Sequence, residues 1–384
     1  GSDSHKYAVY KDGSELIRVH LEKCDGGFLA NIVKNRLKVQ KQMSESEYSQ
    51  PFVYFLALLK SENVMNDTGE VSVIGCRIVA PGDFFWTHSL INEEYLDKLR
   101  KAKEQAPLHI APILAEIEEI KKALPNTKLI GVSDSEFHKD MPAVARLYSL
   151  PEEDRNKFAI YRYGYHGISV ASIIHKLKNE KYLYSLEGST FRRVIVCHLG
   201  SGSSVTAVDN GKSIDTSMGF TPLDGITMGS RVGNIDAGAA MFLGQSKGMS
   251  YLELENYFNT KCGLLGLSGK TKDVRDLIEL ETGGDHGARL ALDSFAYGVR
   301  KYIGAYMAAL GGLDLLVFTA TIGERSSIMR ERFCRDLEGL GISLDKAKND
   351  ATISTDGFIN VEEGQVKIAV VTTDEMGEIM RKIS

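Results

Sequence analysis

The sequence feature that most constrains the fold is a block of short strands that begins near residue 193. An apolar run at residues 193–199 ends in a turn rich in glycine and serine, and a second apolar run follows at 204–208. A further turn at 209–211 then leads into residues 212–215. Strands separated by such turns predict a ladder of hairpins, because Gly and Asn accept the backbone angles that tight reversals require.

Helices and apolar strands surround this ladder in the rest of the chain. The pattern predicts a long helix at residues 288–310, followed at 315–320 by a run that is apolar like a strand buried on both faces. Further strands are expected at residues 15–21, 71–79, 128–132 and 367–372, and helices at 52–59 and at 92–124, with breaks at Pro107 and Pro112. The alternation indicates an α/β fold.

The length of the chain predicts two domains. Its 384 residues exceed the size at which a single hydrophobic core usually keeps growing. We expect a first domain at residues 1–150, completed by the C-terminal helix, and a second at residues 151–384. No flexible linker is visible in the sequence, so the boundary is expected to be a packed hinge near residue 150.

Composition argues against several classes of function. The net charge of −5 provides no general positive field for nucleic acid or an anionic membrane. No apolar run reaches the roughly 18 residues of a membrane span, and no signal peptide is visible. The five cysteines are scattered, which argues against a zinc site or a disulfide framework: they are Cys24, Cys76, Cys197, Cys262 and Cys334. We therefore expect a cytoplasmic protein without nucleic-acid or membrane partners.

Residues 198–204, with the sequence HLGSGSS, form the first candidate binding loop. Glycine lets the backbone approach a ligand closely, and amides and hydroxyls in such a turn can surround phosphate oxygens. An ordinary hairpin turn explains the string equally well when it is taken alone. The loop is not a P-loop, because no Gly-Lys-Ser/Thr follows it.

Three other segments place polar groups where a ligand could bind. Residues 215–231 are rich in small side chains and end on Arg231, whose planar guanidinium suits a carboxylate or phosphate. Residues 319–326 and 372–375 each follow an apolar strand, and ligands of open α/β folds collect at the carboxyl ends of strands. Together the four segments favour a nucleotide site over unrelated turns.

Several long motifs resemble those of the acetate kinases, members of the sugar kinase, Hsp70 and actin superfamily. Residues 133–142, SDSEFHKDMP, are similar to the family's FDTAFHxTMP, and 162–169, RYGYHGIS, to its RYGFHGTSH. Residues 198–204 are similar to HLGNGSS, and 215–236 to DTSMGxTPLEGxxMGTRSGDID. Residues 263–269, GLLGLSG, match GLLGxSG. The motifs occur in the family's order over nearly the whole chain.

The resemblance implies a fold and an activity. The fold would consist of two actin-like, ribonuclease-H-like domains with mixed β-sheets flanked by helices, and the active-site cleft would lie between them. The enzyme would interconvert acetate plus ATP and acetyl phosphate plus ADP by direct in-line phosphoryl transfer. It would use Mg²⁺, with Mn²⁺ as an alternative, and it would form a homodimer.

The resemblance also assigns roles to individual residues. The catalytic groups would be Arg77, Asp134, His166 and Arg231, and the metal ligand would be Glu375. The acid would be bound by Arg77, Val79, Leu108, Tyr165 and Pro222. The nucleotide would be bound by Lys6, His198, Gly200, Ser201, Gly202, Ser203, Asp273, Val274, Arg275, Thr321, Ile322, Gly323 and Arg325.

Departures from the family pattern leave alternatives open. The family begins with Asn-x-Gly-Ser-Ser-Ser-Leu-Lys, so we expect its first strand and its metal-site asparagine to precede residue 1. Thr321 replaces a glycine and Arg325 an asparagine at the nucleoside turn, which motivates pyrophosphate or phosphate as an alternative phosphoryl donor. Propionate and butyrate are alternative acids. A non-catalytic, actin-like nucleotide-binding protein is the alternative from another class.

Overall fold

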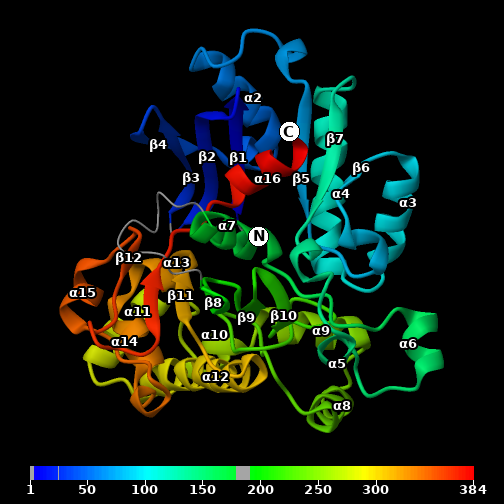
Figure 1. The fold of residues 1–384 in the computed structure, drawn as a ribbon. Helices are drawn as coiled ribbons and strands as arrows, with labels where there is room; N and C mark the ends of the chain where they lie inside the picture. The colour runs from blue at the N-terminus through cyan, green and yellow to red at the C-terminus, as the bar shows by residue number, and fades with distance from the viewer. Residues whose placement is uncertain (1–3, 25, 179–190) are drawn as a thin grey trace. The chain divides into compact units, whose positions relative to one another are not determined.

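The computed structural model describes residues 4–24, 26–178 and 191–384, which form two compact units (Figure 1). Unit 1 comprises Gly1–Asp134 and Glu375–Ser384, and unit 2 comprises Ser135–Asp374. Within the described ranges, no helix is both long enough and apolar enough to cross a membrane. The predicted domains at 1–150 and 151–384 stay a prediction beside these two units.

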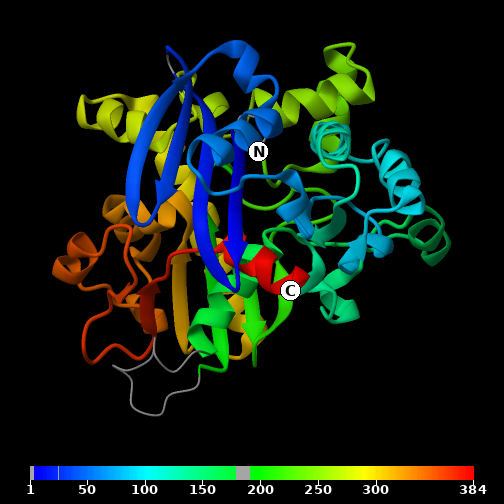
Figure 2. The ribbon, with the colours of Figure 1, turned by 90° about the horizontal axis from the view of Figure 1, so that it is seen from above.

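Unit 1 contains an antiparallel sheet of four consecutive strands, which lie side by side in both views (Figures 1 and 2). The strands are β1 (Ser4–Lys11), β2 (Ser14–Cys24), β3 (Gly27–Lys34) and β4 (Leu37–Met43). The first hairpin turns at Asp12 and Gly13, both with positive φ, which matches the right-handed twist of paired strands. Alternate residues of β2, including Ile17, Val19 and Leu21, are fully buried.

A second sheet of unit 1 carries Arg77 on one strand, and another of its strands ends directly before Asp134. Its strand order is β5-β7-β6, with β5 parallel to β7 and β6 antiparallel to it. The strands are β5 (Val73–Ile78), β6 (Ser89–Leu90) and β7 (Lys128–Ser133). The helices of the unit are α1 (Glu45–Tyr48), α2 (Pro51–Ser61), α3 (Glu93–Ala102), α4 (Pro107–Ala123) and α16 (Glu375–Ile383), with 3₁₀ turns at Thr68–Glu70 and Asp83–Trp86.

The C-terminal helix α16 packs directly on β5. A methyl group built on Gly75 of β5 would lie only 2.6 Å from Cγ2 of Ile379, so glycine is needed for the helix to approach the strand. This packing returns the end of the chain to unit 1 and places Glu375, the first residue of α16, in the same unit as Arg77 and Asp134.

Unit 2 is built on a mixed six-stranded sheet with the order β10-β9-β8-β11-β13-β12. The strands are β8 (Arg193–Leu199), β9 (Ser203–Asp209), β10 (Lys212–Thr216), β11 (Leu315–Thr319), β12 (Gly357–Phe358) and β13 (Lys367–Val370). The hairpins β8–β9 and β9–β10 are antiparallel, whereas β11 runs parallel to both β8 and β13. The predicted hairpin ladder and the predicted parallel strand are confirmed.

Helices cover both faces of this sheet (Figure 1). The long helix α12 (His286–Leu310) packs against one set of alternating strand residues, and α7 (Gly167–Lys178) packs against the other set. The remaining helices are α5 (Ala143–Arg146), α6 (Glu152–Phe158), α8 (Ala237–Ser246), α9 (Tyr251–Thr260), α10 (Gly263–Ser268), α11 (Val274–Thr282), α13 (Ala320–Arg325), α14 (Ser327–Cys334) and α15 (Lys346–Ala351), with 3₁₀ turns at Glu136–His138 and Glu338–Leu340. The predicted α/β fold with mixed sheets flanked by helices is confirmed.

One predicted helix break is wrong. Pro107 does begin α4, where a missing N–H removes no intrahelical hydrogen bond, but Pro112 lies inside the same helix. A proline there removes one bond near the start of the helix. The buried side chains of Ile110, Ile117 and Ile120 anchor α4 in the core, and this packing outweighs the local loss.

Candidate active site

The glycine- and serine-rich loop between β8 and β9 is the centre of the candidate site in unit 2. Within this loop, the amide N–H of Gly200 donates to the carbonyl of Gly202 at 3.1 Å, so the loop turns tightly. A methyl group built on Gly202 would lie 3.3 Å from Nε2 of His166 and 3.4 Å from Nη1 of Arg231. The fold thus brings a glycine-containing turn, an imidazole and a guanidinium, which are far apart in the sequence, close together.

His166 is held in an uncommon backbone conformation at the start of α7. Its φ of +60° lies in the left-handed region, which non-glycine residues rarely adopt and which clusters at functional sites. Its Nδ1 shares a hydrogen bond of 2.9 Å with Oγ of Ser204, on the strand that follows the loop. The ring stacks on that of His198, with the centroids 4.0 Å apart. These contacts orient the Nε2 edge toward Gly202.

Arg231 comes to the same point from the long loop that follows β10. Its Nη1 donates to the carbonyl of Pro222 at 3.3 Å. The amide of Gly229 donates to the carbonyl of Ser201 at 3.4 Å. This bond joins the loop that carries Arg231 to the glycine- and serine-rich loop. The guanidinium is therefore presented by a segment that is itself bonded to the glycine turn.

The residues predicted to bind the nucleoside lie next to this loop. Thr321, Ile322 and Gly323 lie in the short helix α13, immediately after β11. A methyl group built on Gly200 would lie 3.9 Å from the amide nitrogen of Thr321. Ala320, the first residue of α13, has a φ of +64°, a second strained backbone position at the site. The predicted phosphate and nucleoside segments are neighbours.

Two residues without a role predicted from the sequence, the half-buried Glu324 and the buried Arg330, support this turn. One carboxylate oxygen of Glu324 accepts hydrogen bonds from the amides of Ala320 and Thr373, at 2.9 and 3.0 Å. The fully buried Arg330 donates to the carbonyl of Gly323 at 2.8 Å, and burial lowers its pKa to about 10. Glu324 lies within the quoted run 319–326, whereas nothing in the helical run around Arg330 distinguishes it from a surface arginine.

Asp273, Val274 and Arg275 lie at the start of α11. Asp273 caps this helix by accepting from the amide of Arg275 at 2.8 Å, and its carboxylate also pairs with the Arg275 guanidinium. These hydrogen bonds hold the pKa of Asp273 below its usual range. The carbonyl of Lys272 lies 3.3 Å from a methyl group built on Gly229, so α11 begins beside the loop that carries Arg231.

Arg77, Asp134 and Glu375 come together in unit 1. Arg77 at the end of β5 forms a two-point pair with Asp134 after β7, with distances of 3.2 Å from Nε and 2.9 Å from Nη2. Asp134 is fully buried, whereas a third of the Arg77 side chain is exposed. Burial acts to lower the pKa of Arg77, but the charges of Asp134 and Glu375 outweigh it and raise the pKa. Lys6 lies 4.0 Å from Glu375.

The residues predicted to form the acid pocket are divided between the two units. Val79 and Leu108 belong to unit 1, where Val79 is half-buried and Leu108 is exposed. Tyr165 and Pro222 belong to unit 2, where the Tyr165 ring is buried and its hydroxyl donates to the carbonyl of Phe220 at 2.7 Å. The pocket that would combine all four, like the cleft between two domains, stays a prediction.

Oxygen ligands for a divalent cation are present in unit 1. Among the residues that the structure describes, no cluster of three or more His, Cys, Asp or Glu is arranged to hold a metal ion. Mg²⁺ does not need one, because it is often held by one or two carboxylates together with water and substrate phosphates. Glu375 and Asp134, both beside Arg77, are carboxylates of this kind.

Comparison with known proteins identifies the relatives of this chain. The sequence model of the acetokinase family matches residues 1–381. The chain belongs to the acetokinase family. The acetate kinase of Carboxydothermus hydrogenoformans is 40% identical over 98% of this chain and 94% of its own length. That of Bacillus cytotoxicus is 38% identical over 100% and 96%.

Solved structures of the acetokinase family share the fold. The Porphyromonas gingivalis acetate kinase covers 100% of this chain and 98% of its own, with 32% identity and a TM-score of 0.84. A propionate kinase from Francisella tularensis covers 100% and 96%, with 33% identity and a TM-score of 0.85. The predicted membership in this family is confirmed, whereas the roles of single residues stay predictions.

Proposed function

We propose that this acetokinase-family protein is an acetate kinase, which transfers the γ-phosphoryl group of ATP to a carboxylate oxygen of acetate and catalyses the reverse reaction. The observation that carries the proposal is that His166 and Arg231 both lie close to Gly202, in the loop that follows the buried strand β8. The close similarity to acetate kinases over the whole chain supports the same reaction.

In this mechanism the residues of unit 2 stabilise the transferred group. Charge spreads over the three equatorial oxygens of the phosphoryl group in the transition state, and positioned donors lower the barrier. The Nε2 edge of His166 and the guanidinium of Arg231 would donate to these oxygens. The amides and hydroxyls of residues 200–203 would hold the donor phosphates. Helix α11 and the turn at 321–323 would flank the nucleoside.

In unit 1, Arg77 would bind the carboxylate of the acid. Its bond to the buried Asp134 keeps the guanidinium in one orientation, and the two neighbouring carboxylates keep it positively charged. Glu375 would bind Mg²⁺, which supplies charge neutralisation at the donor phosphates when it is present. Mn²⁺ would substitute, because it prefers the same oxygen ligands.

The proposal also concerns which acid and which phosphoryl donor the protein uses. Acetate is favoured by the named relatives, and propionate is the alternative, since one structural neighbour is named as a propionate kinase. ATP is favoured by the same relatives. Pyrophosphate is the alternative donor, because Thr321 and Arg325 put larger side chains on α13 at the predicted nucleoside turn.

We propose further that the protein is a cytoplasmic homodimer. Leu290 and Tyr297 lie seven residues apart on α12, hence on one face of the helix, and their exposed fractions are 57% and 60%. Large apolar side chains gathered on one exposed helix face are typical of a contact surface. Burial of this face against a second copy would remove both from water.

The proposed activity is tested by an acyl phosphate assay with acetate and MgATP. We expect His166→Ala and Arg231→Ala each to lower kcat about 10²–10³-fold, the effect of removing one donor to a charged transition state. Arg192→Ala, which removes a largely exposed arginine of the same unit, is the control and should retain full activity. A wild-type protein that forms no acyl phosphate from acetate would contradict the proposal. Replacing ATP by pyrophosphate, and acetate by propionate or butyrate, decides between the alternatives.

A further inference from the structure

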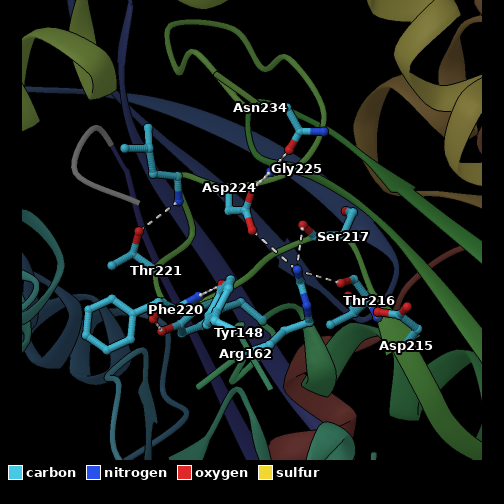
Figure 3. Close-up of polar contacts among 12 residues, drawn as sticks. Tyr148, Arg162, Asp215, Thr216, Ser217, Phe220, Thr221, Asp224, Gly225 and Asn234 are labelled. Carbon is cyan, nitrogen blue, oxygen red and sulfur yellow. Dashed lines mark hydrogen bonds and ion pairs between the residues drawn. The ribbon is translucent and has the colours of Figure 1, made fainter. Parts of the chain in front are cut away.

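Arg162, four residues before His166, is the centre of a polar cluster to which the family resemblance assigns no role (Figure 3). Its Nη1 donates to the carbonyls of Thr216 and Ser217, at 3.2 and 3.4 Å, and lies 3.3 Å from Oδ2 of Asp224. The two carbonyls lie where the chain leaves β10, and Asp224 lies seven residues after Ser217. One guanidinium therefore closes residues 217–224, here called the acid loop, at both of its ends.

A tyrosine pair fixes the middle of the acid loop. The hydroxyl of Tyr148 accepts from the amide of Phe220 at 2.9 Å, and the hydroxyl of Tyr165 donates to the carbonyl of the same residue at 2.7 Å. The Tyr148 ring also lies against the guanidinium of Arg162, with 5.5 Å between its centroid and Cζ. Both peptide groups of Phe220 are thus hydrogen-bonded to tyrosine side chains, and one of these tyrosines, Tyr148, lies against Arg162.

The acid loop is packed too closely to relax freely. A methyl group built on Gly219 would lie 2.2 Å from the Tyr148 hydroxyl and 2.3 Å from Oδ2 of Asp224. A methyl group built on Gly225 would lie 2.6 Å from the carbonyl oxygen of Ser217. Only glycine fits at either position, so the loop holds its shape through contacts between its own ends.

The contacts of Arg162 with the acid loop, here called the clamp, connect to predicted acid-pocket residues and to the predicted catalytic Arg231. The acid loop carries Pro222, a predicted acid-pocket residue, whose carbonyl accepts from Arg231 at 3.3 Å. On the other side, the segment from Arg162 to His166 carries the pocket residue Tyr165. The amide of Tyr163 donates to the carbonyl of Gly219 at 3.1 Å, which joins that segment to the loop. A shift of Arg162 would therefore move the pocket wall and the support of Arg231 together.

The charge of the clamp is retained in its partly buried position. Burial acts to lower the pKa of Arg162, but Tyr148, Asp224 and Asp215 around it outweigh burial and raise the pKa. Only 21% of the Arg162 side chain is exposed, so solvent screens its pair with Asp224 less than a surface pair. All three contacts are made by Nη1, and the shorter side chain of lysine would not bring its ammonium to the same position.

We propose that Arg162 is a positioning residue for the carboxylate substrate: it holds the acid loop closed, so that Pro222 and Tyr165 stay in place and Arg231 keeps its support. The inference rests on the proposed function, because the substrate is the acid of that reaction. Its removal loosens the acid-binding side of unit 2 and leaves the residues predicted to bind the nucleotide, on α11 and α13, in place.

The test compares Arg162→Lys, Arg162→Gln and Asp224→Asn by steady-state kinetics. We expect KM for acetate to rise about 10-fold or more in both Arg162 variants, the usual effect of losing hydrogen bonds to a charged group. Asp224→Asn should raise it less, because its amide oxygen still accepts one bond. KM for the nucleotide should stay within about twofold, and kcat should fall less than KM rises.

Arg193→Gln is the matched control. It breaks another partly buried arginine–carboxylate pair of unit 2, that of Arg193 with Asp314, which lies away from the acid loop in the sheet. It should lower the melting temperature and leave both KM values unchanged. If Arg162→Gln does not fold, Tyr148→Phe, which removes only the acceptor for the amide of Phe220, should raise KM for acetate in the same direction.

The outcomes separate the two proposals. If the wild type phosphorylates no carboxylate, the proposed function fails, whatever the variants do. If the wild type is active and the folded Arg162 variants keep KM for acetate within twofold while melting earlier, as Arg193→Gln does, Arg162 is only structural and the inference is wrong. Equal increases in KM for acetate and nucleotide would also overturn it.

Discussion

Asp314 shows how one side chain joins two neighbouring strands of unit 2. Immediately before β11, it accepts hydrogen bonds from the amides of Arg192 and Arg193, at 3.2 and 2.8 Å, where β8 begins. Burial alone would raise its pKa, but the side-chain and backbone hydrogen bonds from Arg193 outweigh burial and lower the pKa. The carboxylate is therefore more stable in the folded protein than in the unfolded chain.

This shift predicts a pH-dependent contribution to stability. A carboxyl group whose pKa is lower in the folded state stabilises it above the unfolded pKa of about 3.9, and the contribution is lost as the pH falls through the folded value. Asp314→Asn should therefore lower the free energy of unfolding by about 1–2 kcal/mol at pH 7. Below about pH 4 the difference from wild type should shrink toward zero.

Urea unfolding followed by circular dichroism at both pH values measures this difference. Circular dichroism is the suitable signal because the single tryptophan, Trp86, lies in unit 1 and would not report on the strands of unit 2. A difference that persisted unchanged at low pH would show that the loss comes from altered packing, and the role of the charge would be wrong.

Strained residues make a second point at this scale. The motif around His166 was recognisable in the sequence, but the positive φ of His166 and of Ala320 was not, since positive φ is uncommon for any residue other than glycine. Such strain persists only when surrounding contacts determine the backbone. The bonds from Ser204 to His166 and from Glu324 to the amide of Ala320 are contacts of this kind.

At the scale of elements, the central strands of unit 2 were predictable because both of their faces are buried. The five residues of β11 are all fully buried between α7 and α12, so the sequence shows an unbroken apolar run. Residues 27–43 received no assignment, yet they form β3 and β4. All of β4 except Met43 is exposed, and Lys41 interrupts the apolar alternation of Leu37, Val39 and Met43, so the strand signal in its sequence is weak.

The buried strands predict where truncation is costly. Ile368 of β13 is fully buried, and Ile368→Ala should lower the free energy of unfolding by about 2–5 kcal/mol, because the cavity it leaves cannot close. Ile353, 43% of which is exposed, provides the matched control, and Ile353→Ala should cost well under half as much. Urea unfolding of both variants measures the difference. Equal losses would contradict the central place of β13 in the core.

For the whole molecule, the proposed dimer gives a prediction on mass. Light scattering on the wild type should give about twice the chain mass of 42.3 kDa. The double variant Leu290→Glu, Tyr297→Glu puts two charges on the exposed face of α12 and should shift the mass toward the monomer, because a buried, unpaired charge opposes association.

The control for this experiment is Val144→Glu, which changes a side chain that is 93% exposed on α5 and should leave the mass unchanged. A wild type with the mass of one chain would overturn the homodimer itself. A double variant that keeps the mass of two chains would retain the homodimer but show that this face of α12 is not its contact.

What the sequence by itself determined was the family, the α/β class and the hairpin ladder of unit 2. These follow from local patterns: apolar runs, glycine turns and long motifs that remain recognisable without knowledge of contacts. The residue roles inferred from the resemblance remain predictions, and so does the choice between ATP and pyrophosphate.

Only the tertiary structure decided which residues meet. The convergence of Gly202, His166 and Arg231, the support of the nucleoside turn by Glu324 and Arg330, and the clamp of Arg162 on the acid loop all join residues far apart in the chain. The physical reason is that such contacts are set by how the sheet and its helices pack, and packing leaves no periodic pattern in the sequence. The sequence does not distinguish an arginine that closes a loop from one that faces water.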